Sequence, residues 1–270
     1  MRTLRNGVFL AALIGVGLGI SDAKAQQNWA GSYVGLNAGY AWGKTSVGSL
    51  SSCPSPIDSC YFGAVFSPAN MAAIGGAGSG SQSSGGFAGG VQVGNNWQSG
   101  AVVFGVEADV GTFKFSAAQE TRVLPPNPGT LTGLTSTVGT TVDTDWLVTL
   151  RGRLGWSVSS NLLVFVTGGG ALTQMRVANS YSDNVLALGG TRNGSGGGSQ
   201  SEAKIGWTIG GGGEMALNRN WSLKAEYLYL DFGTVTAKGT FAGQSRGPNS
   251  LDTSADLTAH IARVGINYKF

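Results

Sequence analysis

The sequence has 270 residues, of which 46 are glycine and 11% are charged, and its formal net charge is +3. Removal of the first 25 residues, which carry three basic residues and one acidic residue, would reduce that charge to +1. So small a positive balance gives no support to nucleic-acid binding. A glycine-rich chain that is short of charge could be disordered, but the regular aromatic and β-branched runs argue against disorder.

Residues 1–25 have the three parts of a secretory signal peptide. Arg2 and Arg5 supply the positive start, an apolar run follows at 7–20, and Ala23-Lys24-Ala25 gives a small-x-small cleavage site. The apolar run is too short for a membrane-spanning helix, which needs roughly 20 residues. We therefore predict a cleaved signal peptide at 1–25 and one mature domain at 26–270.

Eight later segments alternate between apolar and polar residues and carry aromatic side chains. Each is long enough to cross a bilayer as a tilted barrel strand, for which roughly 9 to 11 residues suffice. The segments are 31–44, 85–98, 101–115, 143–158, 162–176, 203–217, 221–235 and 257–270. The sequence therefore predicts an all-β fold, an eight-stranded antiparallel transmembrane β-barrel.

The connections between these segments alternate between two sizes. Short turns rich in Ser and Asn are expected at 99–100, 159–161 and 218–220. Long polar loops are expected at about 45–84, 116–142, 177–202 and 236–256. This asymmetry is typical of outer-membrane barrels, which have short periplasmic turns and longer extracellular loops. The barrel is thus predicted to have four long extracellular loops, with both chain ends on the periplasmic side.

Two glycine runs lie within the predicted loops. They are GGAGSGSQSSGG at 75–86 and NGSGGGSQ at 193–200. Neither has the Gly-Lys-Ser/Thr of a phosphate-binding loop, so both are predicted to be flexible loop segments.

A barrel strand must present one face to lipid and the other to the lumen. In the last segment, Ala262, Val264 and Ile266 share one face, while Arg263 and Asn267 share the other. The fifth segment begins with LLVFV, which is apolar on both faces, so its phase is left open. Applied to the other segments, the alternation predicts a cluster of inward charges formed by Glu107, Asp109, Arg151, Arg153, Glu214, Lys224, Glu226 and Arg263.

The predicted inward cluster has four acids and four bases. An eight-stranded barrel is just wide enough for side chains to fill, and an unpaired buried charge is costly. We therefore interpret the cluster as a salt-bridged plug, with a narrow ion-conducting path as the alternative. Glycines on the same face would leave room for water or for the long arginine side chains. These glycines are Gly35, Gly39, Gly90, Gly94, Gly210 and Gly212.

Aromatic residues near the segment ends are typical of the girdles that anchor a barrel at the two membrane interfaces. Ligand stacking is the alternative use, but their spread over many strands favours anchoring. The residues are Tyr40, Trp42, Trp97, Trp146, Trp156, Trp207, Trp221, Tyr229 and Phe270.

Cys53 and Cys60 are the only cysteines, and in an exported protein they are predicted to form one disulfide. A tetrahedral metal site is not predicted, because His260 is the only histidine. His260 falls on the lipid face near the outer rim. Its in-phase neighbours, Thr258 and Ala262, offer no good nucleophile for acyl transfer, so we predict no enzyme activity and no cofactor.

Several strings, among them WAGSYVGLNAGYAWG (29–43), WLVTLRGRLGW (146–156) and RVGINYKF (263–270), resemble a known family. It comprises the small porin-like outer-membrane β-barrel proteins of alphaproteobacteria, including immunogenic and haemin-binding proteins. The resemblance implies an outer-membrane location, contact with outer-membrane lipids, and a terminal Phe270 that the barrel-assembly machinery reads. It also implies a structural or surface role, porin-like at most. The alternative is a surface protein that binds haemin or a host or polysaccharide ligand through its loops, although no strand motif carries haem binding to this chain.

Overall fold

The computed structural model describes residues 27–52, 68–126, 132–188, 193–242 and 249–270. The predicted signal peptide and both cysteines, Cys53 and Cys60, lie outside the described residues. Within them, no helix is long and apolar enough to cross a membrane.

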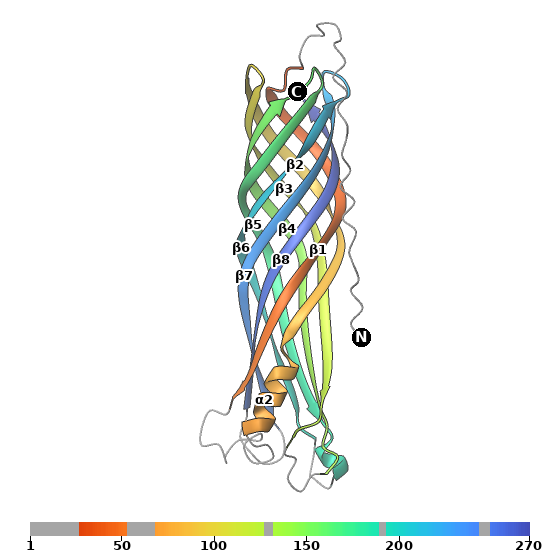
Figure 1. Ribbon diagram of the computed structural model, residues 1–270, viewed down its shortest axis with the longest axis vertical. Helices are drawn as coiled ribbons and strands as arrows, with labels where there is room; N and C mark the ends of the chain where they lie inside the picture. Colours follow the sequence, from red (N-terminus) through yellow and green to blue (C-terminus); the bar gives the residue numbers. More distant parts are fainter. Residues whose placement is uncertain (1–26, 53–67, 127–131, 189–192, 243–248) are drawn as a thin grey trace, which may run out of the picture.

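Eight antiparallel strands form one closed barrel, in which each strand pairs with its neighbours in sequence and β1 pairs with β8. The predicted eight-stranded antiparallel barrel is confirmed. A helix, α2 (Pro68–Ala77), and a short 3-10 helix, Val185–Leu188, lie at one end of the barrel (Figure 1). The strands are β1 Gly31–Ser52, β2 Gly80–Ser99, β3 Val102–Val123, β4 Ser136–Ser157, β5 Leu162–Asp183, β6 Ser195–Ala216, β7 Trp221–Ala242 and β8 Asn249–Lys269.

The short turns lie where the sequence predicts them, at the end that also holds the C-terminus (Figure 1). The predicted loop ranges need correction, because much of each belongs to the strands, which have 20 to 22 residues. Both glycine runs, at 75–86 and 193–200, are also largely regular structure, since they run from α2 into β2 and along β6. Each strand is about twice as long as a bilayer crossing requires.

Apolar residues point outward in one half of the barrel and inward in the other, and β8 illustrates the change. In the half near the short turns, Val264 and Ile266 point outward, and Arg263 points into the interior. Toward the other end, Asp256 points outward while Leu257 is fully buried inside. The first half therefore has an apolar wall around a polar interior, as expected of a barrel in lipid. The second half has a polar wall around an apolar interior, as expected of a barrel in water.

The outer half of the barrel has an apolar core next to the charged interior. Phe113, Phe115, Met175 and Phe232 are all nearly inaccessible to solvent, and the rings of Phe113 and Phe232 have their centroids 6.1 Å apart. Further apolar side chains from β1, β2, β4, β7 and β8 complete this core. It fills the interior just beyond the predicted charge cluster.

The structure also resolves the phase of the fifth strand. Leu163 and Phe165 point inward, and Val164 and Val166 point outward. Leu163 packs with Trp29 and Val103 at the short-turn end of the barrel. Apolar residues close the other end as well, where Ile74 of α2 belongs to a cluster with Val123, Leu134, Val138, Tyr181, Val185 and Leu251.

Candidate functional site: a buried charge cluster in the barrel interior

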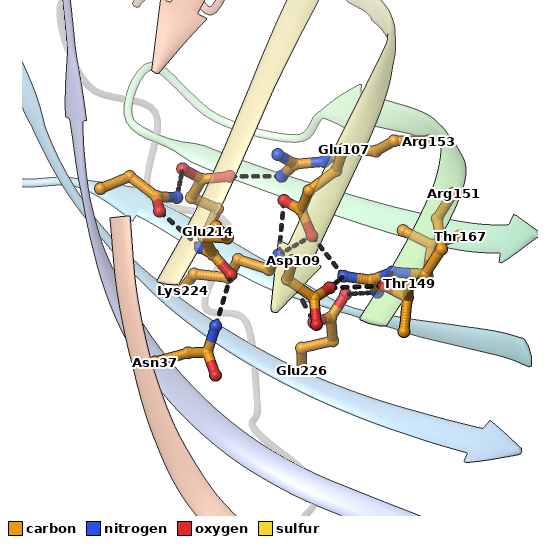
Figure 2. Close-up of polar contacts among 12 residues, drawn as sticks. Asn37, Glu107, Asp109, Thr149, Arg151, Arg153, Thr167, Glu214, Lys224 and Glu226 are labelled. Carbon is orange, nitrogen blue, oxygen red and sulfur yellow. Dashed lines mark hydrogen bonds and ion pairs between the residues drawn. The ribbon is translucent and has the colours of Figure 1, made fainter. Parts of the chain in front are cut away.

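The structure brings all eight predicted inward charges together in the half of the barrel with the apolar wall. Figure 2 labels all of them except Arg263. The period of two along each strand explains their common direction, because Glu107 and Asp109 on β3 are two residues apart, as are Lys224 and Glu226 on β7. All eight side chains are buried. Inside the barrel, five strands contribute these charges: β3, β4, β6, β7 and β8.

Arg151 of β4 is the centre of the cluster, and it is 1% exposed. Its Nη2 lies 2.5 Å from Glu107 Oε1 and 2.7 Å from Asp109 Oδ2, both on the adjacent strand. Its Nη1 lies 2.7 Å from Glu226 Oε1 on β7, across the interior. Nε donates to Thr149 Oγ1 at 3.0 Å. Charged partners thus surround the guanidinium, and hydrogen bonds to charged groups are the strong ones.

Lys224 and Arg263 complete the central group. Lys224 Nζ lies 2.6 Å from Glu107 Oε1 and 3.4 Å from Glu226 Oε2. Arg263 Nη2 lies 2.8 Å from Glu226 Oε2 and 3.2 Å from Asp109 Oδ2. Each acid of this group therefore contacts at least two bases, which offsets the cost of burying it.

Arg153 and Glu214 form a second, linked pair nearer the short turns. Arg153 Nη2 donates to Glu214 Oε2, and the guanidinium lies 4.0 Å from the centroid of the Phe165 ring. Ser222 and Asn267 donate to the other oxygen of Glu214 at 2.5 and 2.8 Å. This carboxylate is therefore fully occupied, as a buried charge needs to be.

Neutral residues that the sequence analysis did not single out extend the network. Tyr33 Oη donates to Glu107 Oε2 at 2.6 Å. Asn37 donates to Gln92 at 3.1 Å, and Gln92 in turn donates to Asn267 at 2.5 Å. These side chains share the inward phase of the charges, which is a signal that could have identified them. They tie β1 and β2 into the cluster.

The inward glycines were predicted to leave room for water or for the long arginine side chains, and what the structure places beside them is mostly backbone or an aromatic ring. A Cβ added at Gly39 would lie 2.7 Å from the Cβ of Arg263, and one added at Gly94 would lie 2.4 Å from the Tyr33 ring. At Gly212 the close atom is backbone, because an added Cβ would lie 2.0 Å from Ala225 O. The interior is therefore tightly filled at these positions.

Comparisons with known proteins agree with this architecture. A family model described as "Outer membrane protein beta-barrel domain" matches residues 9–270. This chain belongs to that family. It is 34% identical to the 31 kDa outer-membrane immunogenic protein of Brucella melitensis biotype 1 over 247 residues, which cover 90% of this chain and 84% of the relative. It is 26% identical to the 25 kDa outer-membrane immunogenic protein of Brucella abortus biovar 1, with 92% and 83% covered.

Among solved structures, OprG from Pseudomonas aeruginosa is similar with a TM-score of 0.37 and 12% identity, covering 91% of this chain and 97% of that one. The predicted resemblance to alphaproteobacterial outer-membrane proteins is confirmed by the family match and by the Brucella relatives. The protein is an outer-membrane β-barrel of the Gram-negative envelope. The short-turn end of the barrel faces the periplasm in such proteins.

The membrane position of this outer-membrane barrel follows from its outward aromatic residues. Trp97, Trp156, Trp221 and Phe270 are exposed near the periplasmic end, and Trp42 and Trp207 are exposed farther out. Tyr40 is exposed as well, whereas Trp146 and Tyr229 are partly covered on the same outer face. Between them the wall is apolar, so these two bands have the arrangement of interfacial girdles.

His260 lies on the outer wall within the outer girdle, as its phase in the sequence predicts. Its ring stacks on Trp42 with centroids 5.7 Å apart, and its Nδ1 lies 2.6 Å from Tyr227 Oη. Phe270 lies at the opposite end, where its N–H donates to Ser32 O at 3.1 Å and its ring meets Tyr268 edge-on at 5.4 Å. The role of Phe270 as an assembly signal stays a prediction.

Proposed function

We propose that this outer-membrane barrel is a non-conducting structural protein of the cell envelope, with an interior closed by its own side chains. The observation that supports the proposal is the succession of filled layers along the interior. Apolar residues around Trp29 close the periplasmic end, the neutral charge cluster follows, and the apolar core of the outer half lies beyond it.

An ion that crossed this interior would have to pass two barriers of different kinds. In the charge cluster it would displace partners that already satisfy Arg151 and Glu226. Beyond the cluster it would enter the apolar core around Phe113 and Phe232, where an isolated charge costs far more than in water. The second barrier would remain even where the first was weakened.

Single-channel recording in planar bilayers tests the proposal. We expect the refolded wild-type protein to show no ohmic steps. The double variant Glu107→Gln/Arg151→Met removes one acid and one base, and it should also stay silent because the apolar core is intact. Ohmic steps from the wild-type protein would refute the proposal. Steps from the double variant alone would mean that the charge cluster, and not the apolar core, is the barrier.

The alternative function is surface binding of haemin or of a host or polysaccharide ligand. Its support is the outer half of the barrel, whose polar wall extends beyond the outer girdle. For haemin, one protein ligand to the iron would be His260 at the inner edge of this wall, the only histidine of the sequence. Saturable haemin binding that is lost in His260→Ala, and retained in Tyr40→Phe, would favour this function over the purely structural one.

A further inference from the structure

Two seams divide the outer half of the barrel. Among the described residues, β2 and β3 form ladder pairs only from Ala88 opposite Phe113 to the short turn, so 80–87 pair with β1 alone. Likewise, 198–206 of β6 pair with β5 but have no ladder partner on β7. The other six ladders run through the outer half with bulges at most. The outer half thus has two seams without a regular ladder, and β6 and β7 pair again beyond theirs, where 195–197 lie opposite 240–242.

The sequence explains where the seams fall. The segments GSQSSGG (80–86) and GSQSEAKIG (198–206) lie along them, and glycine and serine have few side-chain atoms to pack across strands. The strands still touch there, because a Cβ added at Gly86 would lie 2.5 Å from Lys114 O. Backbone groups at the seams are therefore close to one another without a regular ladder.

A groove opens on the outer wall at the seam between β2 and β3. Gly85 and Gly86 line it without side chains, and it extends across β3, β4 and β5 to β6. The ladders beside it are irregular, with register shifts between Thr112 and Phe115 and between Thr144 and Leu147. Missing side chains and bulges together produce the hollow.

The groove lies at the level of the lipid headgroups. Trp146 of the outer girdle directly follows groove residue Asp145 in the sequence. Exposed Phe87, which pairs with the girdle residue Tyr40, directly follows groove residue Gly86. On the membrane side of these aromatics the outer wall is apolar, and on the other side it is polar. Interfacial aromatic side chains sit where hydrocarbon gives way to headgroups.

The charged residues of the groove are two bases, Lys114 and Arg176, and two acids, Asp143 and Asp145. Lys114 Nζ lies 2.7 Å from Asp145 Oδ1, and both side chains are more than half exposed. Arg176 is exposed and lies opposite Asp143 in the β4–β5 ladder, but Asp143 accepts a hydrogen bond from Ser116 at 2.6 Å instead. Among the described residues, no acid lies within ion-pair distance of Arg176. Gln174 donates to Ser201 at 3.1 Å, and both line the groove. Arg176 is thus free to bind an anionic ligand.

We propose that this groove binds the phosphorylated sugar headgroup of an outer-leaflet glycolipid. Arg176 takes the phosphate through its planar fork of N–H donors, with Lys114 as a second positive charge. Asp145 accepts hydrogen bonds from sugar hydroxyls, and the amide N–H groups of Gln174 donate to them. The acyl chains then run along the apolar wall below the girdle. A free sugar phosphate has the same polar chemistry but lacks these chains.

Native mass spectrometry of the refolded protein in detergent micelles, titrated with diphosphoryl lipid A, tests the site. We expect Lys114→Ala/Arg176→Ala to raise the apparent Kd about tenfold or more, the loss of two hydrogen bonds to a charged group. The matched control Lys44→Ala/Lys238→Ala removes the same charge from β1 and β7, outside the groove. It should change the Kd less than about twofold. The heat-dependent gel mobility of each variant reports whether it has folded.

Equal losses in the two double variants would overturn the proposal in favour of diffuse attraction to basic residues. Unchanged binding in Lys114→Ala/Arg176→Ala would overturn it too. Dephosphorylated lipid A and phosphatidylglycerol should both bind more weakly than lipid A. Equal binding by dephosphorylated lipid A would show that the phosphate is not recognised, and equal binding by phosphatidylglycerol would show that the sugar is not recognised. Displacement of lipid A by millimolar glucosamine 1-phosphate would support headgroup recognition. Displacement by inorganic phosphate at the same concentration would refute recognition of a glycolipid.

Discussion

Arg151 of β4 and Glu226 of β7 meet across the barrel interior, with Arg151 Nη1 2.7 Å from Glu226 Oε1. Their strands are not neighbours in the barrel, so this ion pair joins walls that no backbone ladder connects. Both side chains are fully buried. The pair therefore couples the closure of the barrel to the burial of the charges, since the complete set of ion pairs forms only when all five contributing strands are in place.

Removal of Arg151 should strongly destabilise the barrel. Arg151→Met leaves Glu107, Asp109 and Glu226 short of a shared partner, and breaking a buried pair on one side costs about 3–5 kcal/mol. Lys114→Ala is the control, because its exposed pair with Asp145 should contribute at most about 1 kcal/mol.

Urea-induced unfolding of both variants in lipid vesicles measures this difference. A free energy of unfolding for Arg151→Met within about 1 kcal/mol of the wild-type value would mean that the carboxylates find other partners or water.

The outward face of β8 is apolar in one half of the barrel and polar in the other. A new charge at an outward position should therefore be harmful in the first half and tolerated in the second. Val264→Arg places the charge on the lipid-facing wall, where Val264 is 59% exposed, and should cost about 2–4 kcal/mol near the midplane. Ser254→Arg lies on the same face of the same strand but beyond the outer girdle. It should change stability by less than about 0.5 kcal/mol, as surface substitutions usually do. Refolding yield into vesicles, followed by urea titration, compares the two; equal damage would place the membrane boundary elsewhere.

The membrane half of this fold could be predicted from the sequence because lipid imposes a strict rule on it. Wherever the outward residues had to be apolar, the alternation placed Glu107, Arg151 and Arg263 inward, and the structure puts them there. The pairing of these charges could not be predicted, because contacts such as Arg151 with Glu226 depend on how the closed barrel sets the height of each strand. The phase of β5 could not be predicted either, because its first residues are apolar on both faces. Leu163 and Phe165 fill apolar space inside the barrel, and only the packed structure defines that space.

The outer half was predicted as loops because the rule of an apolar outward face does not apply in water. Its strands still alternate, as in Leu251, Ala255 and Leu257 of β8, but the apolar residues have moved to the inward positions. In this opposite phase the alternation of β8 continues in the sequence toward Asn249. The glycine-rich segments of β2 and β6 carry little alternation of any kind. Their strand structure depends on the ladders with β1 and β5.

The tight packing around the inward glycines predicts that even one methyl group is harmful there. A Cβ at Gly39 would lie 2.1 Å from Ala262 O and 2.6 Å from the Cα of Arg263, which are backbone atoms that cannot rotate away. Gly39→Ala should therefore cost about 1–3 kcal/mol, the range for overpacking. Gly170→Ala is the control, since a Cβ there meets nothing within 4 Å. Urea titration in vesicles compares the two, and equal stability of both variants would show that β1 and β8 can separate slightly without cost.

The apolar core of the outer half should contribute as much to stability as the core of a soluble barrel. Phe113 is fully buried on β3, against Phe232 of β7. Phe113→Ala should therefore cost about 3–5 kcal/mol, the sum of lost burial and the cavity left behind. Amide hydrogen exchange distinguishes this variant from Arg151→Met. In Phe113→Ala, exchange should become faster in the outer halves of β3 and β7, while the amides around the charge cluster keep their protection. Uniform loss of protection along β3 would show that the two halves unfold as one unit.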